Sequence, residues 1–138
     1  MKNWGRQYYE AWNGHDAEKV AAFMAEDATY EDLALGVVNK GRTAITDYVH
    51  EAERFSRDYR FEIVSEQASD GRFAFEWVML GTHTGETRGL PATNQPYRIR
   101  GVSVGRLTID GKIEENRDYW NLADFLGQVG LLHPPTSS

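Results

Sequence analysis

The stretch that decides the fold is Gly111-Lys112-Ile113-Glu114-Glu115-Asn116-Arg117-Asp118-Tyr119-Trp120-Asn121, near the end of the chain. It follows directly from an Asp-Gly pair at 110–111, which is typical of a tight turn between two β-rich runs. We therefore predict that this stretch forms a strand and returns antiparallel to a long strand over residues 97–109.

Asp118 is the candidate functional residue of this strand. Alternation of side chains along a strand places Asn116, Asp118 and Trp120 on one face. If that face is directed inward, a carboxylate lies beside an indole in poorly hydrated surroundings. Its pKa then rises towards the range in which it can give and take protons. The alternative is that Asp118 is a solvated partner of Arg117 or Arg106.

Composition limits the classes of function. The chain has 138 residues, of which 41% are hydrophobic and 26% are charged, so it has the size of one domain with a core and room for a pocket. Its formal charge is -6, and no run of Lys or Arg could follow a phosphate backbone. We therefore expect neither nucleic acid nor an anionic membrane as a partner.

The residue types that are missing limit the chemistry further. The chain contains no cysteine, which excludes disulfides, thiolate nucleophiles and Cys-ligated zinc. Its four histidines show no short metal-binding spacing, so we predict no metal. Residues 1–12 lack the apolar core of a signal peptide, and no apolar run approaches the roughly 20 residues of a spanning helix. We therefore expect a cytoplasmic protein.

The first part of the chain predicts two short helices. Residues 3–13 carry aromatic and small apolar side chains at helical spacing, and an Asn-Gly pair ends this helix. Asp16 is typical of an N-cap, and the apolar side of the second helix extends to Met24 before Glu26-Asp27 closes it. His15 lies at the corner between the helices, where we expect it to satisfy backbone groups rather than to do chemistry.

A second acid follows in residues 28–33, which have strand character. Alternation groups Asp32 with Tyr30, so we expect this carboxylate to share a face with an aromatic ring. Val37-Val38 is expected to form a short partner strand. Residues 41–55 then predict a third helix with one apolar side, which must lie on the sheet that follows.

The second half of the chain predicts a sheet of long antiparallel strands. From residue 59 the apolar period changes to two, and Ser69-Asp70-Gly71 predicts a hairpin. Residues 72–84 carry apolar groups on both faces, which indicates a central strand that is covered on both sides. The loop 85–96 is placed to rim a cavity, and the apolar stretch 122–132 is placed to cap it. Helices followed by such a sheet predict an α+β roll.

Motifs along nearly the whole chain resemble one family. They are Tyr9-x-Ala11-Trp12-Asn13-x-His15-Asp16, Tyr30-x-Asp32, Glu76-Trp77-x-x-x-Gly81-Thr82-His83-Thr84-Gly85, Gly89-x-Pro91-Ala92-Thr93, and Asp110-Gly111-Lys112-Ile113 followed by Asp118-Tyr119-Trp120. Their order and spacing together resemble the SnoaL-like polyketide cyclase family, within the nuclear-transport-factor-two-like superfamily. We therefore expect residues 1–138 to form a single domain of this kind.

The resemblance implies a fold and a kind of site. The fold is a cone-shaped α+β barrel, in which three N-terminal helices pack on a curved, mainly antiparallel sheet. A deep apolar pocket at its wide end takes a small hydrophobic ligand, and the outer surface of the sheet commonly forms a homodimer. One reaction is not implied, because the superfamily includes aldol-type cyclases, isomerases, epoxide hydrolases, dehydratases and proteins that only bind ligands.

The resemblance also implies roles for two residues. Asp118 is similar to an aspartate that removes a proton α to a carbonyl and returns it to the new hydroxyl, without cofactor or metal. His83 is similar to a histidine that donates a hydrogen bond to the enolate oxygen, and we expect the two residues roughly 10 Å apart on next-but-one strands. The alternative for His83 is a strand-end histidine with satisfied hydrogen bonds. The expected ligand-binding residues are Trp12, Tyr30, Asp32, Glu76, Trp77, Asn116 and Trp120.

Glu76 departs from many relatives, which carry an arginine in the central strand. It is a second proton carrier, a solvent-exposed side chain, or an ion-pair partner of Arg98 or Arg100 across the adjacent strand, and we favour the ion pair. The departure bears on the substrate rather than on the fold.

Three functions follow from these expectations. The first is a cofactor-independent enzyme that transfers protons in a hydrophobic, carbonyl-bearing small molecule, by aldol-type cyclisation or isomerisation. The second is a module of the same fold that binds a small molecule without transforming it. The third is an epoxide hydrolase, which needs two acids bridged by an arginine around a water; Glu86, Arg88 and Asp118 supply the residue types.

Overall fold

The predicted α+β class is confirmed in a computed structural model, which describes residues 4–132. The predicted loose C-terminal tail, residues 133–138, lies outside the described residues. The elements in chain order are α1 (Trp4–Asn13), α2 (Ala17–Ala22), β1 (Met24–Asp32), β2 (Val37–Lys40), α3 (Arg42–Phe55), β3 (Arg60–Ser69), β4 (Arg72–Thr82), β5 (Pro96–Leu107), β6 (Ile113–Trp120) and α4 (Leu122–Gln128).

The six strands form one mixed sheet in the order β2-β1-β6-β5-β4-β3. All neighbouring pairs are antiparallel except β1 and β6, which are parallel. The sheet therefore is mainly antiparallel, as expected. Within the described residues it stays open, since β2 and β3 form its two edges. The cone of the expected barrel is thus completed by helices rather than by strand pairing.

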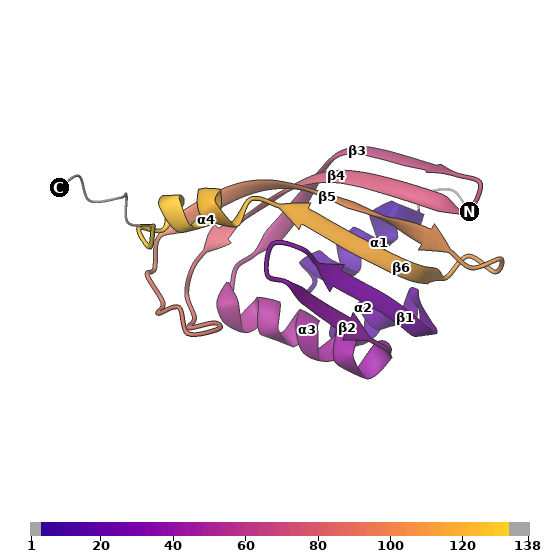
Figure 1. The fold of residues 1–138 in the computed structure, drawn as a ribbon, viewed down its shortest axis with the longest axis horizontal. Coiled ribbons are helices and arrows are strands. Elements are labelled where there is room, and N and C mark those ends of the chain that lie inside the picture. Colours follow the sequence, from indigo (N-terminus) through magenta and orange to yellow (C-terminus); the bar gives the residue numbers. More distant parts are fainter. Residues whose placement is uncertain (1–3, 133–138) are drawn as a thin grey trace.

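Helices α1, α2 and α3 cover the concave side of the sheet, and the long strands curve over them (Figure 1). The core between these layers is unusually rich in rings. Trp4 on α1, for example, meets Phe73 and Phe75 of β4 edge-on, with ring centroids 5.4 and 5.1 Å apart. Edge-to-face pairs of this kind add to the free energy gained from burial alone, so the aromatic spacing of the first helix fixes it against the sheet.

The second helix is shorter than the sequence predicted. It ends at Ala22, and β1 already begins at Met24. Met24 is fully buried and pairs with Ile113 of β6, while its carbonyl accepts two hydrogen bonds from the Arg42 guanidinium, at 2.8 and 3.1 Å. Tertiary pairing thus overrides the helical apolar pattern here.

The corner between the first two helices is confirmed as structural. The Asp16 carboxylate caps α2 by accepting from the Lys19 backbone N–H at 3.1 Å. The His15 ring lies 2.8 Å from the carbonyl oxygen of Tyr59 and stacks on the Tyr59 ring, with centroids 4.0 Å apart. These contacts tie the corner to the start of β3.

The last part of the chain follows the predicted order. Residues 69–72 form the hairpin between β3 and β4, with Asp70 and Gly71 both at positive φ. The apolar stretch after β6 forms α4, which Asn121 caps by accepting from the Asp124 N–H at 2.9 Å. This helix lies beside β5 at the end of the sheet that carries the loop between β4 and β5 (Figure 1).

Candidate active site

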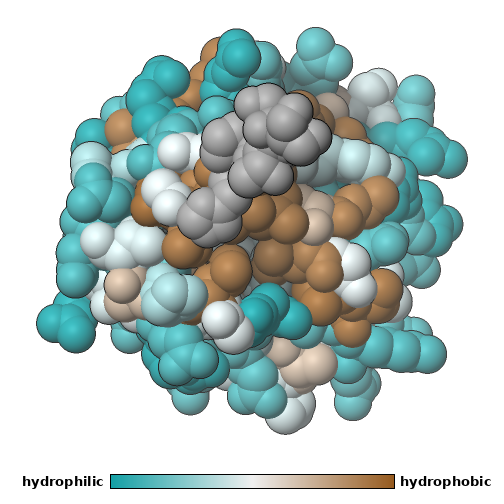
Figure 2. Space-filling model, turned by 60° about the vertical axis from the view of Figure 1, so that its left-hand side comes forward, coloured by the Kyte–Doolittle hydropathy of each residue, from teal (hydrophilic) through white to brown (hydrophobic). Residues whose placement is uncertain are grey.

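A cavity of about 350 Å³ opens at the end of the molecule where α3, α4 and the loop between β4 and β5 meet the sheet. In Figure 2, hydrophobic residues gather in this hollow and hydrophilic residues surround it. The rings that line the cavity include Trp12, Tyr30, Tyr48, Phe55, Trp77 and Trp120. A hydrophobic molecule with one or two rings fits a cavity of this size and lining.

Asp118 lies in the wall of this cavity and is only 6% exposed. Its Oδ1 accepts hydrogen bonds from Ser103 Oγ at 2.5 Å and from Asn116 Nδ2 at 2.9 Å. Among the described residues, its Oδ2 accepts one hydrogen bond, from the Tyr30 hydroxyl. A carboxylate oxygen can accept two hydrogen bonds, so Oδ1 is filled and Oδ2 keeps one open position.

Burial raises the pKa of Asp118 to about 6. The hydrogen bonds from Ser103, Tyr30 and Asn116 oppose this shift because they favour the charged form, and the negative charge of Asp32 adds to it. The expectation that Asp118 faces inward among rings is met. It is not a solvated partner of Arg117 or Arg106, because Arg117 pairs with Glu115 and Arg106 pairs with Glu114 and Glu115.

The orientation of the Ser103 hydroxyl is fixed by its other neighbours. Ser103 Oγ accepts a hydrogen bond from Trp77 Nε1 at 2.9 Å and a longer one from the Tyr9 hydroxyl at 3.3 Å. With both acceptor positions used, its single proton is left for Asp118. The buried Trp77 indole therefore orients the Ser103 hydroxyl, which donates to Asp118.

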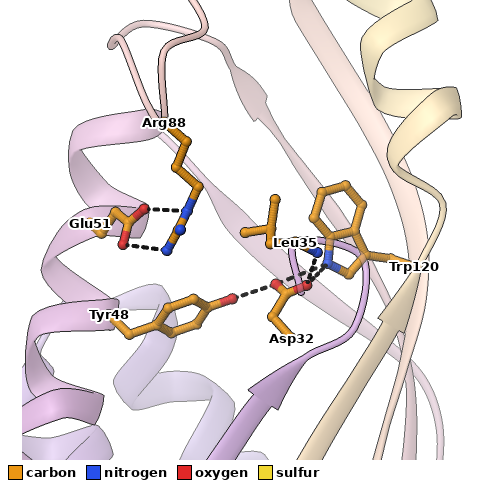
Figure 3. A network of polar contacts seen from close by, with 6 residues as sticks. All are labelled: Asp32, Leu35, Tyr48, Glu51, Arg88 and Trp120. Carbon is orange, nitrogen blue, oxygen red and sulfur yellow. Dashed lines mark hydrogen bonds and ion pairs between the residues drawn. The ribbon is translucent and has the colours of Figure 1, made fainter. Parts of the chain in front are cut away.

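Asp32 is the second buried acid of the cavity wall and is 2% exposed. Figure 3 shows its carboxylate between Tyr48 of α3 and Trp120 of β6. Oδ1 accepts from the Leu35 backbone N–H and from Trp120 Nε1, both at 3.0 Å. Oδ2 accepts from the Tyr48 hydroxyl at 2.6 Å and from the same indole at 3.1 Å. Three donors thus make four contacts with this carboxylate, because the indole N–H is shared between its two oxygens.

The cavity wall also contains an ion pair. Arg88, in the loop between β4 and β5, binds Glu51 of α3 through two contacts, at 2.8 and 3.1 Å (Figure 3). The pair connects the loop to the helix. The Arg88 guanidinium binds Glu51 and does not bridge Asp32 and Asp118. Glu86, Arg88 and Asp118 therefore do not form the arrangement that an epoxide hydrolase requires.

The expected closeness of His83 and Asp118 is wrong. Asp118 pairs with Ser103, which pairs with Phe75, so Phe75 is the residue of β4 level with Asp118. His83 lies eight residues farther along the same strand direction, or roughly 26 Å of extended chain. The spacing of two strands accounts for only roughly 10 Å, and the displacement along the strands adds to it. The two side chains therefore do not face one carbonyl group.

His83 is nevertheless a buried polar residue. Its ring packs against Phe55 and Phe125, and its Nδ1 lies 3.1 Å from Thr93 Oγ1. Burial lowers its pKa, so the ring is neutral at neutral pH. Among the described residues, its Nε2 has no hydrogen-bond partner. Only Nδ1 therefore has the hydrogen bond that a strand-end histidine was expected to form, within the described residues.

The expected role of Glu76 in ligand binding is also wrong. Glu76 is exposed on the outer face of the sheet, opposite the face that carries Trp77, and it does not line the cavity. Its carboxylate accepts from Ser65 Oγ at 3.1 Å. Within the described part of the chain it forms no ion pair with Arg98 or Arg100, and its register partner on β5 is Val102.

The other predicted ligand-binding residues either line the cavity or contact Asp118. Trp12, Tyr30, Asp32, Trp77 and Trp120 line the cavity. Asn116 reaches the site only through its hydrogen bond to Asp118.

Sequence reasoning missed Ser103 and Tyr48, the residues that bind the two carboxylates. A signal for Ser103 was present. The inward face of β5 carries Gly101, Ser103 and Gly105, and a Cβ atom on Gly101 would lie 2.2 Å from the Trp77 ring. Such a run of small residues on one strand leaves space for large rings of the neighbouring strand. A serine between two such glycines is therefore expected to lie beside those rings. For Tyr48, the sequence indicated only a place on the apolar side of the third helix.

Comparison with known families places the chain. The SnoaL-like domain matches residues 5–116, which is most of the chain, and the chain belongs to this family. The match ends two residues before Asp118, so the place of that residue comes from the structure. A candidate polyketide cyclase of Xanthomonas campestris is 31% identical, with a TM-score of 0.77, over 91% of this chain and 93% of that one.

More distant structures share the fold. A protein of ketosteroid isomerase-like fold from Catenulispora acidiphila, solved with trimethylamine, has a TM-score of 0.82 at 22% identity, over 95% of this chain and 96% of that one. The candidate hydroxylase AclR of Streptomyces galilaeus has a TM-score of 0.78 at 23% identity, over 94% of this chain and 84% of that one. Comparison with curated proteins found no match.

In residues 4–132, the part of the chain that the structure describes, no three His, Cys, Asp or Glu side chains are grouped so that they could hold a metal ion. None of its helices has both the length and the apolar character needed to cross a membrane.

Proposed function

We propose that this protein is a cofactor-independent enzyme of the cyclase or isomerase kind, which moves a proton at carbon in a hydrophobic, carbonyl-bearing small molecule. The proposal rests on the surroundings of Asp118. It combines burial in the wall of an apolar cavity, a pKa of about 6, and one open acceptor position on Oδ2. A base with these properties is ionised at neutral pH and still binds a proton strongly enough to take one from a carbon acid.

The charges of the cavity wall indicate which ligands it admits. Asp32, Glu51 and Asp118 are acidic, and Arg88 is the one basic residue of the lining. An anionic ligand would meet this excess of negative charge in surroundings that screen it poorly. A neutral, flat, hydrophobic ketone or a cyclic precursor of one fits best.

In the proposed reaction Asp118 acts twice. Its ionised Oδ2 removes a proton from the carbon next to the carbonyl group, which leaves an enolate. The protonated carboxyl then returns the proton, to carbon in an isomerisation or to the new hydroxyl oxygen in a cyclisation. The donors Ser103, Asn116 and Tyr30 hold the carboxylate in place through both steps.

The test uses 2-tetralone, a flat hydrophobic ketone, as a probe of proton removal in deuterated buffer. We expect the wild type to accelerate exchange of the α protons, followed by NMR, with a rate that rises with pH through about 6. Asp118→Asn should bring exchange to the buffer rate. Binding is read separately from tryptophan fluorescence, because Trp12, Trp77 and Trp120 line the cavity. Full exchange activity in Asp118→Asn would remove the proposal.

The second candidate is a binding module that does not transform its ligand. It is favoured by one observation, that His83 does not lie opposite Asp118 as a donor for an enolate oxygen. A bound ketone whose α protons exchange no faster than in buffer would support this candidate over the enzyme.

A further inference from the structure

The cavity wall holds two buried acids with unequal hydrogen bonding. Asp32 and Asp118 are register partners on the parallel strands β1 and β6. Such partners direct their side chains to the same face, and neighbouring strands lie about 4.8 Å apart. Both oxygens of Asp32 have two contacts, because the Trp120 N–H is shared between them, whereas Oδ2 of Asp118 has a single donor among the described residues.

This difference separates what the two groups can do. A protonated carboxyl needs an acceptor for its own proton, and around Asp32 the Leu35 N–H, the Tyr48 hydroxyl and the Trp120 indole N–H all donate. These donors converge on both oxygens and fix the position of the carboxylate. The Trp120 N–H is shared between the two oxygens, so three donors hold the carboxylate through four contacts. We therefore expect Asp32 to act mainly as a buried charge, although it lines the cavity.

We propose that Asp32 is a positioning residue, a fixed negative charge beside Asp118 that strengthens Asp118 as a base. The inference deepens the proposed function and rests on it for its catalytic meaning. Two like charges on adjacent strands repel, and the repulsion is relieved when Asp118 takes up a proton. Asp32 thus favours the protonated form of Asp118 without touching the substrate.

No other charge of the described residues is placed to do this. The titratable groups that face Asp118 from the helices and from β1 are Tyr8, Tyr9, Tyr48 and Tyr30, and burial raises the pKa of each well above its normal value, so all four stay neutral. The residues of β4, β5, β6 and α4 that line the cavity are otherwise not titratable. The Arg88–Glu51 pair has no net charge.

The test measures the titration of Asp118 directly, without a substrate. Protein labelled with ¹³C at the aspartate side-chain carboxyl carbon is titrated by NMR, and the Asp118 signal is identified by its loss in Asp118→Asn. In Asp32→Asn, which keeps the shape of the side chain, we expect the Asp118 midpoint to fall by about one unit or more, from the Coulomb energy of one charge at this separation.

The matched control is Tyr48→Phe. It breaks the same hydrogen bond between α3 and β1 that the first variant perturbs, but it leaves the charge of Asp32 in place. We expect its Asp118 midpoint to stay at the wild-type value. Equal shifts in the two variants would show that the network, rather than the charge, sets the basicity of Asp118, and no shift in Asp32→Asn would also overturn the inference.

Two further readouts complete the test. If Asp32→Asn does not fold, the wild-type spectrum still decides, because Asp32 must give the signal of an ionised carboxylate while Asp118 titrates. A protonated Asp32 at neutral pH would overturn the inference. The pH profile of 2-tetralone exchange should shift down with the Asp118 midpoint. A shifted midpoint with no exchange activity in any protein would remove the proposed function and leave only the charge effect.

Discussion

Replacing the candidate base should stabilise the protein at neutral pH. The free energy of folding includes the cost of burying the Asp118 carboxylate, which raises its pKa from 3.8 to about 6. At 1.36 kcal/mol per pKa unit, this difference corresponds to about 3 kcal/mol against the folded state when the group is ionised in both states. Asp118→Asn removes the charge and nearly keeps the shape. Its weaker hydrogen bonds to Ser103 and Tyr30 offset part of the gain, so we expect a net stabilisation of about 1–2 kcal/mol at pH 8.

The sign of the pH dependence follows from the direction of the shift. Because the pKa is higher in the folded state than in the unfolded chain, the folded state binds the proton more tightly. The resulting stability is fully present below pH 3.8 and is lost as pH rises through 6. Relative to Asp118→Asn, the wild type should therefore gain about 2 kcal/mol between pH 8 and pH 4.

Urea denaturation of both proteins at several pH values measures this difference directly. The comparison between the two proteins removes the contribution of the acids that do not interact with Asp118. A difference in unfolding free energy that does not change between pH 4 and pH 8 would refute the reasoning. So would a difference that changes in the opposite direction, since either result means that Asp118 is not a buried, destabilised carboxylate.

Two other substitutions test the frame around the base. Ser103→Ala should raise the pKa of Asp118 above its wild-type value and lower the unfolding free energy by about 1–3 kcal/mol, because Asp118 loses a donor and Trp77 Nε1 loses its acceptor; an unchanged ¹³C titration midpoint would contradict this. Gly101→Ala should cost about 1–3 kcal/mol in urea denaturation, because its Cβ would lie 2.2 Å from the Trp77 ring, and wild-type stability would show that the ring is free to move.

Much of the fold was predictable because its signals are local. The alternation along the last three strands and the turn residues between them placed the long hairpins correctly, and residues 42–55 form the third helix as the apolar spacing indicated. The end of the second helix was predicted wrongly. Its boundary is set at Met24 by pairing with a strand almost ninety residues later, and no local pattern contains that information.

The site was predictable where it depends on faces and unpredictable where it depends on register. Alternation correctly grouped Asp118 with Asn116 and Trp120, and all three lie on the inner side of the sheet. The distance from Asp118 to His83 depends on how far each strand slides along its neighbour. That displacement is fixed by the loop between β4 and β5 and by the packing of whole strands, so residue spacing alone gave a value that was far too short.

The proposed division of roles between the two acids illustrates why neither composition nor position identifies a catalytic group. Asp32 and Asp118 are the same residue type, occupy paired positions on adjacent strands and are both buried. Each carboxylate has three donors, and only their arrangement differs. The Trp120 N–H is shared between both oxygens of Asp32, so each of these oxygens has two contacts, whereas Oδ2 of Asp118 has one contact among the described residues. If the charge of Asp32 strengthens Asp118 as a base, the stability lost by burying two like charges contributes to the proposed activity, and substitutions that stabilise either position should weaken proton transfer.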